Sequence, residues 1–466
     1  MAAIETFDPV ASPAGRRLQY LWLVYDSLIR TDADGELVPG LAESWEYNDD
    51  NTVFELTLRE GLTFTDGAAL DAEAVKANLD RALATNGPQS AQLALVESVE
   101  AVSPTEVRIN LSAPNPSLPV VLSQNLGLMV SPEALDARDL DTNPVGAGPY
   151  TLDADDTVPD DHYTFTRNPD YPDADDFPFA EVTIRVIADR TAIFQGVRAG
   201  ELDAGEGNAE VAAAAEGTDV EILTQPTDTA GVMLLDRQGE IVPALGDVRV
   251  RQALNHAVDR EAIVESIVRG YGTPTSQFIS PGMDGYDESL DDAYAHDPER
   301  ARQLLAEAGY EDGFTLPILA TSESTTVVEA IAGQLEEVGV SVEIVPASPS
   351  GLSHDLLEGT HAAVYLPWGM TDTYIDAQFL LNPESAYNPT GASDPEMLAL
   401  VDEGAAQQPE ERDATYRELS ARIVEQAWYL PLYVADAIYL VGPDVEDVTL
   451  TPHVITPSIR GWQPAA

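Results

Sequence analysis

The sequence has no cysteine among its 466 residues. Disulfide frameworks, iron–sulfur clusters, thiolate zinc sites and cysteine nucleophiles are therefore excluded. No stretch approaches the roughly 18 uninterrupted apolar residues that predict a membrane-spanning helix. Residues 1–9 lack the basic start and the apolar core of a signal peptide, so we expect either a cytosolic protein or a chain whose leader was trimmed.

Basic residues are scarce as well. The chain has 23 Lys and Arg against 81 Asp and Glu, a formal charge of −58, and Lys76 is its only lysine. Nucleic acid and anionic membranes are excluded as partners, because both recruit clustered Lys and Arg. The arginine bias fits a high-GC genome or a salt-rich habitat. We interpret the acidic pairs as solvated surface charge that keeps the protein soluble and monomeric, rather than as metal or acid–base sites. These pairs are Asp49-Asp50, Asp155-Asp156, Asp160-Asp161, Asp175-Asp176 and Asp291-Asp292.

Motifs for nucleophiles, nucleotides and metals are also missing. The sequence contains neither G-x-S-x-G, nor a phosphate loop, nor H-E-x-x-H. Gly205-Glu206-Gly207 has no third glycine and has an acid where phosphate would sit. The histidines form no i, i+4 pair; they are His162, His256, His296, His354, His361 and His453. We expect no catalytic residue, no metal site and no cofactor.

Local patterns in the first half indicate a small α+β module. Phe54, Leu56 and Leu58 alternate with polar residues, as in a half-buried strand. Asp71 is placed to cap a helix that runs to Leu83. Further patterns predict a helix over 20–29, a strand over 107–111, strands within 164–186 and a helix over 192–200.

The second half has the character of an α/β domain. Asp247 opens a predicted helix that continues to 267 and ends before Gly270, and Asp297-Pro298 opens another. Strand 314–319, helix 326–338 and strand 340–345 form a βαβ unit, which predicts a parallel sheet. A helix over 409–427 and a strand over 430–441 follow. The change of character predicts two lobes with a seam near 237–246, while length alone suggests about three domains.

An ordered series of short motifs runs through the whole chain. The motifs are Phe7-Asp8-Pro9, 24–28, 37–45, 54–64 followed by Asp66-Gly67, 144–150, 247–254, 297–310 and 427–432. In this series the sequence resembles the extracytoplasmic solute-binding proteins of ABC importers, family 5, the peptide/nickel group. The motifs read as scaffold turns and caps, so they indicate the fold rather than the ligand.

The resemblance implies an α/β, two-lobed periplasmic-binding-protein fold, class II or cluster C type, with an extra α+β subdomain in the first lobe. Residues 1–35, 150–235 and 443–466 would form the main domain of lobe 1, 36–149 the inserted subdomain, and 236–442 lobe 2. It also implies an extracytoplasmic, lipid-anchored protein whose leader and part of a first strand precede residue 1. Its partners would be an ABC permease with its ATPase subunits.

By the same likeness, three regions would supply the ligand contacts. The residues are Arg16, Arg17, Gln19 and Tyr20; Gln89, Gln92 and Asn125, next to Gln124; and Trp368, Asp372, Tyr374 and Tyr387. An amphipathic aromatic such as Trp368 suits a binding cleft, because it offers area and a hydrogen bond at low entropy cost. Asp372 would meet the amino terminus of a peptide, and Arg17 a carboxylate.

Three functions remain open at this level. A receptor for a short peptide is the preferred hypothesis. A nickel or other metal-chelate receptor is the alternative, but such relatives hold chelate carboxylates with arginines where this chain has Gln89 and Asn125, and they add a histidine near 385–387 that is missing here. A peptide hydrolase would require an activated nucleophile or a metal site that the chain does not show.

Overall fold

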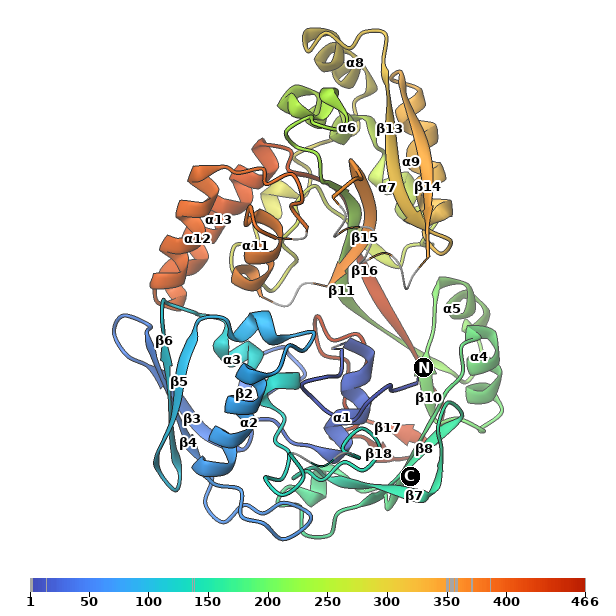
Figure 1. The fold of residues 1–466 in the computed structure, drawn as a ribbon. Coiled ribbons are helices and arrows are strands. Elements are labelled where there is room, and N and C mark those ends of the chain that lie inside the picture. The colour runs from blue at the N-terminus through green and yellow to red at the C-terminus, as the bar shows by residue number, and fades with distance from the viewer. Residues whose placement is uncertain are drawn as a thin grey trace. The chain divides into compact units, whose positions relative to one another are not determined.

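The computed structural model describes residues 3–13, 15–135, 137, 139–348, 352, 356, 359–369, 372–385 and 387–465. Its contacts divide the chain into two compact units: unit 1 comprises Met1–Gln225 and Ala437–Ala466, and unit 2 comprises Pro226–Asp436. The chain therefore passes between the units twice, within β11 (Glu221–Leu234) and within β16 (Tyr429–Val441) (Figure 1). The three-part division, with 36–149 as a separate subdomain, stays a prediction.

Unit 1 contains a four-stranded antiparallel sheet in the order β3-β4-β6-β5. Its strands are β3 (Ala42–Tyr47), β4 (Val53–Leu58), β5 (Val96–Ser103) and β6 (Glu106–Leu111). The predicted alternation is confirmed, because Phe54 is buried opposite Ile109 of β6. Helix α2 (Ala72–Ala84) begins as predicted, since the Asp71 carboxylate accepts hydrogen bonds from two backbone N–H groups of the first turn.

A second sheet of unit 1 has three antiparallel strands in the order β7-β8-β9, and the pairs β1-β2 and β17-β18 form two-stranded sheets. They are β7 (Tyr150–Val158), β8 (His162–Arg167) and β9 (Glu181–Arg185). The short elements of the unit are α1 (Leu18–Val24), α3 (Leu118–Val121), α4 (Arg190–Arg198), α5 (Ala209–Ala215), β1 (Ile29–Thr31), β2 (Leu37–Pro39), β10 (Ala204–Glu206), β17 (Val445–Glu446) and β18 (Gln463–Pro464). The helix predicted over 20–29 is too long, because the backbone becomes extended at Tyr25 and Ile29 begins β1.

The main sheet, on which unit 2 is built, has the order β10-β16-β11-β15-β13-β14, with β12 (Gly272–Pro274) paired to β16. Its other strands are β13 (Phe314–Thr321), β14 (Val340–Ala347) and β15 (Ala363–Gly369). The predicted βαβ unit is confirmed: β13 and β14 are parallel, and α9 (Thr325–Glu336) connects them. The sheet is nevertheless mixed, because β15 is parallel to β13 but antiparallel to β11. Strand β11 enters from the other unit, and this sets a direction that local periodicity does not reveal.

The prediction of one long helix from Asp247 to 267 is wrong, because the structure has two shorter helices there. Helix α6 (Val248–Ala257) begins after Asp247 as predicted, but the backbone of Val258 is extended. Asp259 then caps a second helix, α7 (Arg260–Ser266), by accepting a hydrogen bond from the Ala262 N–H at 2.9 Å. Aspartate competes for backbone donors in this way and starts a new helix without changing the apolar spacing. The remaining described helices of the unit are α8 (Pro298–Glu307), α11 (Thr373–Leu381), α12 (Pro395–Ala406) and α13 (Pro409–Glu425).

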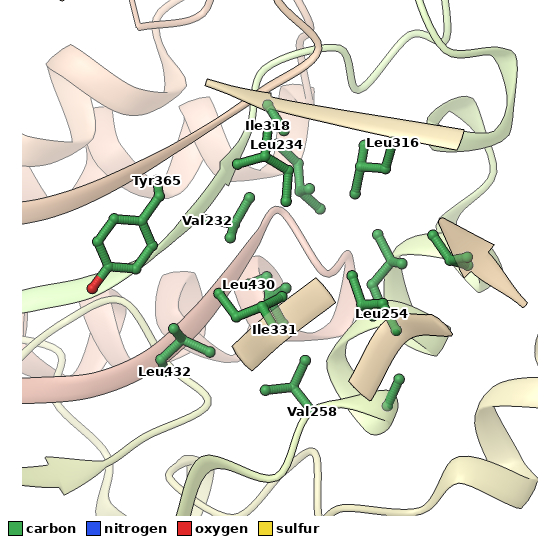
Figure 2. Packing of buried hydrophobic residues seen from close by; sticks show 14 of the residues in the cluster. Val232, Leu234, Leu254, Val258, Leu316, Ile318, Ile331, Tyr365, Leu430 and Leu432 are labelled. Carbon is green, nitrogen blue, oxygen red and sulfur yellow. The ribbon is translucent and has the colours of Figure 1, made fainter. Parts of the chain in front are cut away.

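The core of unit 2 lies between the main sheet and its helices (Figure 2). Leu234, Ile318 and Leu430 reach it from three strands, and Leu254 and Ile331 come from α6 and α9. All five side chains are buried. Because β15 contributes Tyr365 to the same cluster, the strand is anchored in this core, and the candidate site begins at its far end.

Candidate ligand-binding site

Aromatic side chains gather at the end of β15 in unit 2. The rings of Trp368 and Tyr387 meet edge to face, with centroids 4.7 Å apart and planes at 82°. Phe379 and Phe278 lie at centroid distances of 6.2 and 6.4 Å from Trp368. Trp368 pairs with Thr229 of β11, so the sheet fixes the backbone that carries the indole. Such ring pairs contribute more stabilising free energy than their buried area alone would give, and they hold the rings in fixed positions.

Two aspartates lie at the start of α11, and one of them contacts the rings. Asp372 caps the helix: its Oδ1 accepts hydrogen bonds from the backbone N–H of Tyr374 at 2.9 Å and of Ile375 at 3.2 Å. Asp376 is only 4% exposed, and its Oδ1 accepts a hydrogen bond from the Trp368 indole Nε1–H at 3.1 Å. Asp376 therefore orients the indole, and Asp372 is linked to Asp376 through its own backbone N–H.

Asp376 is a functional candidate that sequence reasoning missed. Asp376 lies in the first turn of α11, and its Oδ2 accepts a hydrogen bond from the backbone N–H of the N-cap residue Asp372 at 3.4 Å. The signal becomes visible only once α11 is placed, because nearly all of this helix is buried and it shows no segregation of polar and apolar faces.

The two predicted tyrosines of this region are neutral phenols. Burial, followed by the charges of Asp402 and Asp372, raises the pKa of Tyr374, which is buried in α11. Burial alone raises the pKa of the half-buried Tyr387. Both hydroxyl groups therefore keep their proton at neutral pH and can donate a hydrogen bond.

A buried arginine holds the loop that carries Tyr387. Asn388 is fully buried; its Oδ1 accepts a hydrogen bond from the Arg237 guanidinium at 2.7 Å, and its Nδ2 donates to the Ala392 carbonyl at 2.7 Å. The same guanidinium donates to the Leu234 carbonyl at 2.6 Å and lies 4.6 Å above the Trp428 ring. Burial lowers the pKa of Arg237. These contacts join β11 to the Tyr387 loop, a link between positions that sequence reasoning did not connect.

The two predicted arginines lie in unit 1 and are engaged in ion pairs there. Arg16 Nε lies 3.1 Å from the buried carboxylate of Glu206, which Arg190 also contacts. Arg17 pairs with Glu5 at 2.6 Å. Ligand binding by either arginine would have to compete with these carboxylates, and it stays a prediction.

Gln19 and Tyr20 lie in the interior of unit 1. Tyr20 is fully buried, and its ring centroid is 5.2 Å from that of Tyr163. Burial raises the pKa of its phenol far above the ordinary value. Gln19 is also buried and donates from Nε2 to the Pro457 carbonyl at 3.0 Å. Both residues thus have structural contacts within the unit, and the ligand contacts predicted for them remain predictions.

Asn125 holds the Asp-Pro turn near the start of the chain. It is 1% exposed, and its Nδ2 donates to the carbonyls of Pro9 at 3.1 Å and Ser12 at 2.9 Å. Gln92 donates to Gln89 Oε1 at 3.1 Å, and both glutamines are half-buried. The structure therefore places Trp368 against Tyr387 and links Trp368 through Asp376 to Asp372, while Tyr374 lies buried in α11. Asp372 caps α11, and the predicted residues of unit 1 likewise have partners of their own.

Within the described ranges, no group of three or more His, Cys, Asp or Glu side chains is arranged to hold a metal ion. His354 lies outside those ranges. Of the helices that the structure describes, none has the length and apolar content needed to cross a bilayer.

Comparison with known proteins identifies the family of the chain. Residues 36–390 match the family model described as bacterial extracellular solute-binding proteins, family 5 Middle. The chain is 30% identical over 337 residues to the glutathione-binding protein GsiB of Escherichia coli O1:K1 / APEC, a match that covers 69% of this chain and 63% of the relative. The chain thus spans somewhat less than two thirds of the length of this relative.

Solved structures match over the whole chain. The ABC transporter substrate-binding protein CtaP of Listeria monocytogenes superposes with a TM-score of 0.87 at 22% identity, covering 100% of this chain and 98% of the other. NikA of Brucella suis, solved in complex with Fe(III)-EDTA, gives 0.86 at 25% identity, covering 99% and 98%.

The fold and the family match define a solute-binding protein of the periplasmic-binding-protein type, a class of transport components rather than enzymes. More particularly, the chain belongs to family 5 of the bacterial extracellular solute-binding proteins. The predicted resemblance and fold class are confirmed.

Proposed function

We propose that the protein is the substrate-binding component of an ABC import system and that it captures a short peptide for delivery to a membrane permease. Membership of the family supports the receptor role. The observation that carries the choice of ligand is the acidic start of α11, where Asp376 contacts Trp368 of the Trp368–Tyr387 pair and Asp372 is linked to Asp376.

This cluster has the chemistry that recognises a peptide ammonium. Carboxylates accept charge-assisted hydrogen bonds from a cation, and aromatic rings attract it through their quadrupole. The neutral phenol of Tyr387 adds a donor for a peptide carbonyl. GsiB, whose name states that it binds glutathione, a tripeptide, supports the same ligand class.

A metal chelate is the alternative ligand, and NikA bound to Fe(III)-EDTA shows that such a ligand occurs on this fold. A polycarboxylate chelate needs basic groups. Gln89 and Asn125 are neutral, and Arg16 and Arg17 are paired with Glu206 and Glu5. The electrostatics therefore favour the peptide. Peptide hydrolysis is disfavoured by the family assignment.

Hinge closure is the proposed mechanism of capture. Ligand contacts from both units would stabilise a closed state more than an open one, and only such differential affinity shifts the population. The two crossings, within β11 and β16, support this proposal because a pair of connecting strands can act as a hinge.

The test is calorimetry with a dipeptide and tripeptide library against a nickel–histidine chelate. We expect a peptide to bind more tightly than the chelate. Asp372→Asn should weaken peptide binding by about 1.5–3 kcal/mol, the value of a hydrogen bond to a charged group. Trp368→Ala should weaken it too, by loss of stacked area.

Asp297→Asn is the matched control. Asp297 is exposed and caps α8 in the same unit through the Arg300 N–H. Since asparagine is also a good N-cap, both variants should keep their helices, and only Asp372→Asn should affect binding. Tight binding of the chelate without any binding of a peptide would reverse the ranking of the two ligands. Hydrolysis of a peptide by the protein would contradict the receptor role and favour a hydrolase.

A further inference from the structure

A cavity of about 330 Å³ lies within unit 1, away from the aromatic cluster described above. Every residue that lines it belongs to this unit. The cavity lies between β9, the edge strand of the three-stranded sheet, and β10, the edge strand of the main sheet. A space beneath Arg30 and Tyr171 in the same unit is, by comparison, only about 50 Å³.

The cavity separates two apolar clusters that packing does not join. Ile184, Tyr439 and Trp462 belong to the cluster on one side, whereas Ile193 belongs to the other and Leu202 packs against it. The cavity opens to solvent, because Glu181, Glu201 and Asp203 of its lining are exposed. Its volume falls in the range of pockets that hold small ligands.

Close packing of α4 on β10 accounts for the glycine at the middle position of this strand. Gly205 lines the cavity, and a Cβ atom at this position would lie 2.5 Å from Cγ2 of Ile193. Because α4 packs this closely on β10, the strand has glycine where a larger residue would fill the space.

The charged residues around the cavity favour a ligand of one charge. Glu181, Glu201 and Asp203 are exposed residues of its lining, against the single base Arg185. The deeper Glu206 is buried and already paired with Arg16 and Arg190. With Arg16 and Arg190 included, four carboxylates face three arginines. The remaining excess lies at the exposed Glu181, Glu201 and Asp203, and it disfavours an anion and attracts a cation.

The aromatic lining suits a cation as well. Phe179, Tyr439 and Trp462 contribute rings, and the last two meet edge to face with centroids 6.1 Å apart. An organic cation gains from ring faces as well as from carboxylates.

We propose that this cavity is a second ligand site that binds a small organic cation with an apolar body. The ammonium group lies at the acidic mouth, near Glu201 and Asp203, and the apolar body occupies the space between Ile184 and Ile193. Since one unit supplies the whole lining, binding here needs no closure and does not compete with a peptide at the Trp368 cluster. The site is independent of the proposed import function.

Calorimetry with three probes that share a phenylethyl body tests the proposal: cationic 2-phenylethylammonium, neutral 2-phenylethanol and anionic 3-phenylpropanoate. The cation should bind most tightly, the alcohol more weakly and the anion not measurably. Val182→Phe, which adds volume to a half-buried residue of the lining, should weaken cation binding by about tenfold or more, the equivalent of about 1.4 kcal/mol. Absence of binding by every probe, or equal binding of all three, would overturn the proposal.

A second variant keeps the test decisive if Val182→Phe fails to fold. Glu201→Gln combined with Asp203→Asn should weaken binding of the cation about twofold to fivefold and leave the alcohol unchanged, the range expected for exposed charge pairs. The matched control is Glu210→Gln with Glu216→Gln, two exposed acids at α5 in the same unit. An equal loss in the control would show attraction by the overall charge instead and would overturn the assignment.

Discussion

At the scale of single residues, the few basic side chains of this acidic protein are concentrated where they hold the fold. Asp173 illustrates this, because Arg30, Arg59 and Arg460 all approach its carboxylate, at 3.0, 3.4 and 3.8 Å. Arg460 also lies 4.8 Å above the Phe177 ring. The cluster joins segments far apart in unit 1, and its members are partly buried, so their attraction is screened less than that of an exposed pair.

This cluster predicts how acid weakens the protein. Burial by itself would raise the pKa of Asp173, but the hydrogen bond from Arg30 and the charges of the three arginines outweigh it, and the pKa lies below its ordinary value of 3.8. A depressed carboxylate pKa contributes stability that is present above the unfolded value and is lost as the pH falls through and below about 4.

We therefore expect Asp173→Asn to lower the free energy of unfolding at pH 7 and the difference from the wild type to shrink below about pH 4. Urea unfolding from neutral pH to pH 3 measures both curves. Asp175→Asn is the control, since Asp175 is exposed in the same turn. A constant difference across this range would show that the ionised form of Asp173 contributes nothing.

At the scale of elements, two glycines in different surroundings should respond in opposite ways to replacement by alanine. A Cβ at Gly231 of β11 would lie 2.5 Å from the Leu430 carbonyl oxygen of β16, a rigid backbone atom. Gly333 in α9 is exposed, and a Cβ there would meet nothing within 4 Å.

Gly231→Ala should destabilise unit 2 by about 1–3 kcal/mol, because the strands must move apart. Gly333→Ala should stabilise it by about 0.8–1 kcal/mol, because alanine is the better helix former. Thermal and urea unfolding of the two variants measure the contrast. A stable Gly231→Ala protein would mean that the strands separate at little cost.

At the scale of the whole molecule, the charge of −58 should make stability depend on salt. Mutual repulsion opposes compaction, and the Debye length falls from about 30 Å at 0.01 M salt to about 8 Å at 0.15 M. We expect the melting temperature to rise over this range and further toward molar KCl. A flat or falling melting temperature would show that the acids are already compensated in the folded state.

The proposed hinge also belongs to this scale. Ligand binding should lower the radius of gyration measured by small-angle scattering, and closure should occur on the μs–ms timescale of hinge motions. Asp372→Asn at the same peptide concentration is the control, and it should show a smaller decrease. A peptide that binds tightly without compaction would contradict the hinge while leaving the family assignment intact.

Features that depend on residues a few positions apart could be predicted from the sequence. Asp71, Asp247 and Asp297 were recognisable as helix caps, because an aspartate acts on N–H groups two or three positions away. The βαβ unit over β13, α9 and β14 was visible for the same reason, since each element has its own apolar period. The family resemblance was also predictable, because its motifs are short turns and caps in a constant order.

Only the tertiary structure decided the features that join distant positions. It placed Tyr20 in a core, assigned the Asn125 amide to the Asp-Pro turn, paired Arg16 with Glu206 and brought Asp376 under the Trp368 indole. It also made the main sheet mixed. Most of these features depend on the free energy of contacts between residues separated by tens to hundreds of positions. The contact of Asp376 depends instead on α11, a helix in which polar and apolar residues are not segregated to different faces. No local window of sequence contains that information.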